Sequence, residues 1–134
     1  MPDAVAVDLR VLGDVEPLWR AWLEDAARRT REPLEPGRLD EQLPGWRPLL
    51  ERFAADNGPV HLRPSAPVTA ELRRLRNRGA RIGVFSDVPV ELAQLAVAHL
   101  GAARRVDVVG TLDDVRRELG EPAVARTLDE LREV

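Results

Sequence analysis

Short, almost entirely apolar runs alternate along this chain with longer stretches of helical periodicity. Runs of the length expected for strands buried on both faces of a parallel sheet lie at 4–9, 81–85 and 106–109. Apolar residues recur at intervals of three and four over 14–29, 47–56, 68–77 and 89–100, which predicts helices there. This alternation predicts an α/β fold in which right-handed crossovers connect parallel strands within three layers.

Turn and capping residues define the ends of several predicted elements. Asp14 is predicted to cap the first helix, and Asn57-Gly58-Pro59 is predicted to end the second. The proline-rich stretch 31–44 between these helices is predicted to be mostly loop. Near the C-terminus we expect a helix beginning at Asp113 or Asp114, a short edge strand at 123–126 and a final short helix.

The length and composition set the number of domains. The chain has 134 residues, of which 44% are hydrophobic and 32% charged, in the ordinary range for a globular protein. We therefore expect a single domain over 1–134. The early helices and their loop, over 13–64, are expected to form an insert above the sheet.

Charge and residue content exclude several classes of function. The net charge is −3, and all 20 basic residues are arginines interspersed with acids, so no basic patch for nucleic acid is expected. The absence of cysteine excludes thiolate nucleophiles and zinc–thiolate sites. No apolar run has the length of a membrane span, and the start of the chain lacks a signal peptide's basic residues. We therefore expect a cytoplasmic protein without nucleic-acid or membrane partners.

Polar residues follow the predicted strands, at the sheet edge where open α/β proteins bind ligands. Asp8 and Arg10 follow the first strand, and Ser86 and Asp87 follow the strand at 81–85, so we expect them at one edge. The position of Asp8 suits a covalent nucleophile or a metal ligand, and equally a cap for the next segment's backbone. Ser86-Asp87 suits either an anion site or a helix N-cap. The spacing leaves these alternatives open.

Three stretches carry a more specific pattern. Residues 5–12 place an acid at the end of a strand, residues 72–87 join a helix, a glycine and a strand to Ser86-Asp87, and residues 99–110 form the next crossover. Together, over residues 5 to about 110, they resemble the haloacid-dehalogenase (HAD) superfamily. In that family an early strand ends in Asp-x-Asp-x-Thr, whose first Asp is the nucleophile, and a second motif supplies a phosphate-binding Ser or Thr.

The resemblance implies a Rossmann-like, HAD-like fold in which residues 13–64 take the place of a helical cap over the active site. It implies that Asp8 is the catalytic nucleophile and that Ser86, with Asp87 and Arg10, binds phosphate. Because 110–114 partly resembles the family's fourth, acidic motif, it also implies a Mg²⁺ site formed by Asp8, Asp113 and Asp114.

The chain departs from the family at several catalytic positions. Arg10 replaces the second Asp, which is the general acid/base of phosphatase members, and a guanidinium cannot exchange that proton. Val11 and Leu12 replace the usual Gly-Thr, and the chain has no lysine for the third motif. The segment 110–114 also lies at the point in the chain where the family has an earlier strand. Without that segment, Asp8 alone would hold Mg²⁺ poorly.

These departures lead to competing hypotheses for function. The first is a HAD-like protein with degenerate catalytic motifs that binds a phosphate-bearing ligand, a protein partner or a second copy of itself. The alternative is an active Mg²⁺-dependent phosphatase with Asp8 as nucleophile. A C–halogen hydrolase, which would need no Mg²⁺, is a third hypothesis, so the role of Mg²⁺ is left open.

Aromatic residues concentrate in the predicted insert, which contains Trp19, Trp22, Trp46 and Phe53. They either pack the insert helices against each other or form a protein-binding surface. Under the second interpretation, we predict that part of the face around Trp19 and Trp22 remains exposed.

Overall fold

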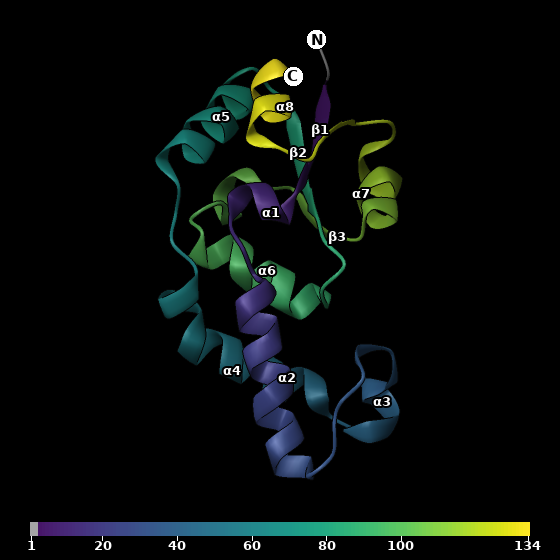
Figure 1. The fold of residues 1–134 in the computed structure, drawn as a ribbon. Helices are drawn as coiled ribbons and strands as arrows, with labels where there is room; N and C mark the ends of the chain where they lie inside the picture. Colours follow the sequence, from purple (N-terminus) through teal and green to yellow (C-terminus); the bar gives the residue numbers. More distant parts are fainter. Residues whose placement is uncertain (1–2) are drawn as a thin grey trace.

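Four parallel strands form one sheet in the computed structural model, which describes residues 3–134 (Figure 1). The strands are β1 (Ala4–Asp8), β2 (Arg81–Phe85), β3 (Val108–Gly110) and β4 (Ala123–Ala125). Their order across the sheet is β3-β2-β1-β4, so β1 and β2 are central. The predicted α/β fold with a parallel sheet is therefore confirmed.

The register of the two central strands brings their C-terminal ends together. Val5 lies opposite Ile82, and Asp8 lies opposite Phe85. The side chains of Val5, Val7 and Ile82 are fully buried, as expected for apolar runs covered on both faces. Because Ser86 directly follows Phe85, Asp8 and Ser86 lie at the same edge of the sheet, as predicted.

Helices cover both faces of the sheet and extend beyond it. They are α1 (Leu9–Leu12), α2 (Glu16–Thr30), α3 (Leu39–Gln42), α4 (Trp46–His61), α5 (Ala66–Asn77), α6 (Val90–His99), α7 (Leu112–Leu119) and α8 (Leu128–Glu133). Helix α7 packs on one face, where Val115 joins Ala6 in a small apolar cluster, and α5, α6 and α8 lie on the other (Figure 1). None of the helices in the described range has the length and apolar content needed to cross a membrane.

Helices α2, α3 and α4 project away from the sheet as a helical extension (Figure 1). Helix α2 packs on α4, and α4 packs on α6, which connects the extension to the sheet. These elements occupy the segment 13–64 for which a cap-like insert is predicted. That this segment acts as a cap remains a prediction.

Helix α4 is longer than predicted, because Asn57-Gly58-Pro59 does not end it. The helix continues through Pro59 to His61, and the Leu62 N–H donates to the Gly58 carbonyl at 2.8 Å. The reason is tertiary packing. A Cβ atom on Gly58 would lie only 2.8 Å from the His99 ring, so the absence of a side chain lets α4 and α6 approach closely. Close packing here outweighs the local cost of a proline within the helix.

Several predicted boundaries need smaller corrections. Helix α2 begins at Glu16, whose N–H donates to the Asp14 carboxylate at 3.1 Å, although Val15 occupies the N-cap position. The predicted loop 31–44 contains a 3₁₀ turn and α3, and Trp46 Nε1 donates to Asp40 at 2.8 Å, which ties α3 to α4. Strand β3 starts two residues later than predicted.

The tryptophans of the extension form an internal cluster. Trp19 is 8% exposed, Trp22 is 2% exposed and Trp46 is 6% exposed. The rings of Trp19 and Trp22 stack with centroids 5.5 Å apart, and Trp46 lies 6.0 Å from Trp22. The predicted exposed face around Trp19 and Trp22 is therefore wrong, because α2 and α4 bury it against each other. That the chain binds a protein partner or forms a homodimer stays a prediction, and no surface of the structure is assigned to that contact.

Candidate functional site

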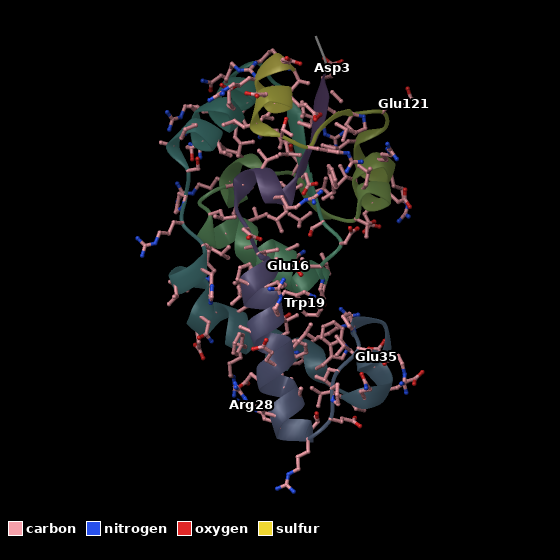
Figure 2. All side chains as sticks on the ribbon, in the orientation of Figure 1. Asp3, Glu16, Trp19, Arg28, Glu35 and Glu121 are labelled. Atoms are coloured by element: carbon pink, nitrogen blue, oxygen red, sulfur yellow. The ribbon has the colours of Figure 1, made fainter. Side chains whose placement is uncertain are left out.

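A cavity of about 330 Å³ opens at the C-terminal edge of the sheet, where α2 begins. We call it the Asp8 pocket. Its lining consists of Asp8, Arg10, Asp14, Val15, Glu16, Phe85, Ser86, Asp87, Val88, Leu112 and Arg126. Figure 2 shows Glu16 at the junction between the sheet and the helical extension, with Trp19 one turn further along α2. Residues at the ends of β1, β2 and β4 line the pocket, because these neighbouring parallel strands end at the same edge of the sheet.

Asp8 lies at the base of this pocket with its side chain 6% exposed. Its Oδ1 accepts hydrogen bonds from the Arg10 backbone N–H at 3.0 Å and from Nε at 3.3 Å. Its Oδ2 accepts from Arg10 Nη2 at 2.7 Å and from Nε at 3.2 Å. Asp8 therefore caps α1, as one of its two interpretations proposed, and it is also engaged at both oxygens by one guanidinium.

The charge of Asp8 is favoured by its surroundings. Burial alone would raise the pKa of Asp8, but the hydrogen bonds from Arg10 and the charges of Arg10 and Arg126 lower this pKa below its ordinary value. The hydrogen bond to Asp8 in turn raises the pKa of Arg10. Asp8 and Arg10 are consequently an ion pair at neutral pH, and Arg10 holds no proton that it could donate in a reaction.

Ser86 and Asp87 line the pocket, as predicted, but neither caps a helix. The N-cap of α6 is Pro89, and no side chain bonds to it. The Ser86 N–H donates to the Gly110 carbonyl at 3.0 Å, and Ser86 Oγ accepts from the Val88 N–H at 3.2 Å. The hydroxyl hydrogen of Ser86 can still be donated to a ligand, because these bonds use only the backbone N–H and one lone pair.

Arg126 is a pocket residue that the sequence pattern did not reveal. It directly follows β4, which pairs with β1, so it reaches the same edge as Asp8. Its guanidinium lies over the Phe85 ring at 5.2 Å from the centroid. The predicted edge strand at 123–126 was the available signal. Finding Arg126 also required knowing that this strand lies next to β1, which depends on long-range pairing.

Asp113 and Asp114 do not line the Asp8 pocket. Asp114 instead completes a capping box at the start of α7, where its Oδ2 accepts the Thr111 N–H at 3.0 Å and Thr111 Oγ1 accepts the Asp114 N–H at 3.1 Å. The Thr111 hydrogen bonds lower the pKa of Asp114. Thr111, rather than Asp113 or Asp114, is thus the N-cap of this helix.

The residues present do not fit a Mg²⁺ ion. Residues 3–134 contain no group of three or more His, Cys, Asp or Glu side chains placed to hold a metal. The predicted ligand set of Asp8, Asp113 and Asp114 is therefore not assembled, because two of its members follow edge strand β3 and β2 separates β3 from β1. Of the four acids that line the pocket, Asp8 is the buried one, and Arg10 already binds both its oxygens.

Comparisons with known proteins support the fold. No family model and no curated protein matches the sequence. Among solved structures, the chain is similar to a "putative beta-phosphoglucomutase from Thermotoga maritima", at 18% sequence identity and a TM-score of 0.55. The similarity covers 89% of this chain and 71% of that chain. At this identity the likeness shows the fold alone, a parallel α/β sheet flanked by helices.

Proposed function

We propose that this HAD-like protein binds a phosphate-bearing ligand in the Asp8 pocket without hydrolysing it. The observation that carries the proposal is the pairing of Arg10 with both oxygens of Asp8. A carboxylate that attacks phosphorus needs a free lone pair. Asp8 has about four acceptor sites, and it accepts three hydrogen bonds from the Arg10 guanidinium and one from the Arg10 backbone N–H. Under this proposal, the catalytic motifs of the chain are degenerate.

Two further features support binding without turnover. The residue two positions after Asp8 is an arginine, which cannot protonate a leaving group, and such general acid catalysis typically contributes about 10²–10⁴-fold in rate. The pocket nevertheless offers anion-binding groups, namely the Arg10 and Arg126 guanidinium groups and the Ser86 hydroxyl. A volume of about 330 Å³ suits a small phosphate ester.

An active hydrolase with Asp8 as nucleophile is the second candidate. The lowered pKa of Asp8 favours it, because the carboxylate stays ionised at neutral pH. In this case the ligand phosphate would have to draw Arg10 away from Asp8, which would free an oxygen for attack. This candidate predicts turnover that depends strictly on Asp8.

A direct test measures binding and hydrolysis on the same preparation. The similarity to a putative beta-phosphoglucomutase makes glucose phosphate a suitable first ligand. A suitable generic substrate is p-nitrophenyl phosphate. We expect saturable binding of glucose phosphate by calorimetry, and hydrolysis no faster than that of the Asp8→Asn variant. Asp129→Asn, on the exposed start of α8, provides a matched control for the substitution. Turnover well above the Asp8→Asn level would refute the proposal and establish the hydrolase.

A further inference from the structure

We infer that Arg126 and Arg10 form a two-arginine clamp that takes the ligand's phosphate group without a divalent metal. This inference rests on the proposed function and deepens it, because it assigns the groups that supply the positive charge. Arg126 enters from β4 and Arg10 from the segment after β1, so adjacent strands place both arginines on the Asp8 pocket.

Arg126 has the free donors that a ligand site requires. Within residues 3–134 its guanidinium makes no hydrogen bond or ion pair, and its one ring contact is with Phe85 at 5.2 Å. Phe85 is 6% exposed and fixed in β2, so it provides a rigid support for the flat guanidinium. A contact of this kind with a ring uses none of the N–H groups of the guanidinium as hydrogen-bond donors, so they stay available to an oxyanion.

Arg10 can bind an anion while it stays bonded to Asp8. The hydrogen bonds to Asp8 use Nε and Nη2, and no bond within the described chain uses Nη1. The Arg10 side chain is 75% exposed, so this unused nitrogen is accessible. A guanidinium carries five N–H donors, enough to serve a carboxylate on one edge and a phosphate on the other.

The charge balance favours an anion over a cation at the base of the pocket. Arg10 neutralises Asp8, and Arg126 then leaves a net positive charge that already lowers the pKa of Asp8. A Mg²⁺ ion at Asp8 would lie beside the Arg10 guanidinium, and residues 3–134 contain no group of three or more His, Cys, Asp or Glu side chains placed to bind it. The other acids of the lining, Asp14, Glu16 and Asp87, are exposed, and so are both arginines, so solvent and salt screen all of these charges. Asp87 also contributes to the raised pKa of Arg10, so it offsets part of the positive charge near the mouth of the pocket.

The test is a calorimetric or ³¹P NMR titration of the full chain with inorganic phosphate, run once with excess EDTA and once with MgCl₂. We expect the same dissociation constant in both conditions. Arg126→Gln should weaken binding by about 10-fold to 100-fold, the usual effect of losing one charged hydrogen-bonding partner. Arg116→Gln, which removes the same charge from an exposed position on α7 outside the pocket, should leave the affinity unchanged.

Each alternative result has a distinct meaning. Binding only in the presence of Mg²⁺ would overturn the clamp and leave the proposed function standing. Equal losses in Arg126→Gln and Arg116→Gln would also overturn the clamp, since a general change in protein charge would then explain both. No binding under either condition would overturn the proposed function itself. Arg126→Lys guards against misfolding: it keeps the charge and should retain more affinity than Arg126→Gln, at an unchanged melting temperature.

Discussion

Among the glycines, Gly83 in the middle of β2 is the one at which an added Cβ atom would make the shortest contact. A Cβ atom there would lie 2.5 Å from Val115 Cγ1 on α7, 3.0 Å from Val108 Cγ1 and 3.1 Å from Leu119 Cδ1. Val115 is fully buried and β-branched, so it has little freedom to move away. The Gly83→Ala substitution must therefore push α7 off the sheet or distort β2.

The size of the effect follows from two opposing contributions. Overpacking of a core costs about 1–3 kcal/mol, and a contact this short with a stiff side chain belongs in the upper part of that range. Alanine also restricts the unfolded chain, which stabilises the protein by about 0.4–1 kcal/mol. We therefore expect Gly83→Ala to lower the free energy of unfolding by about 2 kcal/mol.

Urea unfolding followed by circular dichroism measures this difference. Gly37→Ala is the control, because a Cβ atom on Gly37 would meet no other atom within 4 Å and its backbone does not need a positive φ. The control should be as stable as wild type, or up to about 1 kcal/mol more stable. Val115→Ala combined with Gly83→Ala should cost less than the sum of the single changes. A Gly83→Ala protein as stable as wild type would refute the packing argument.

Three further predictions address the extension, a helix cap and the buried acid. Trp22→Ala should lower stability by about 3–5 kcal/mol and leave the sedimentation-derived association state unchanged; altered association at unchanged stability would contradict the buried cluster. Thr111→Ala should cost about 1 kcal/mol in urea unfolding, because α7 loses its N-cap, and no loss would show that the cap is dispensable. The pKa of Asp8 is lowered from 3.8, so its stabilising contribution is present above that pH and lost as the pH falls through the folded-state pKa. The stability difference between wild type and Asp8→Asn should therefore be largest near neutral pH and shrink in acid; a difference independent of pH would contradict the ion pair.

The parts of the fold predicted correctly are those that depend on local pattern. The runs at 4–9 and 81–85 are apolar because both faces of β1 and β2 are covered, and burial of this kind is visible in the sequence. The parallel arrangement then fixes Asp8 and Ser86 at one edge without knowledge of side-chain contacts. The same reasoning could not place β4 beside β1, so it could not bring Arg126 to the pocket.

Two differences between prediction and structure have different physical causes, one in tertiary packing and one in a local signal. Asn57-Gly58-Pro59 is a strong stop signal, yet contact between Gly58 and His99 keeps α4 helical. The place of Asp114 in the capping box could be predicted from sequence. Thr111 followed three residues later by an acid is the pattern of a capping box, and this pattern assigns the acid to the helix start instead of a metal.

The residues that pair in the sheet differ from the charged residues of the Asp8 pocket, because the strands end just before most of the latter. The ladder between β1 and β2 constrains residues up to the pair of Asp8 with Phe85, and its stability depends on buried apolar side chains before that pair. Arg10 and Arg126 lie just beyond the ladders, where a change of side chain alters charge in the pocket and leaves sheet pairing intact. A parallel sheet of this kind can therefore persist while the groups at its edge change. The proposed binding therefore depends on Arg10, Arg126 and Asp8 themselves, and not on the fold that presents them.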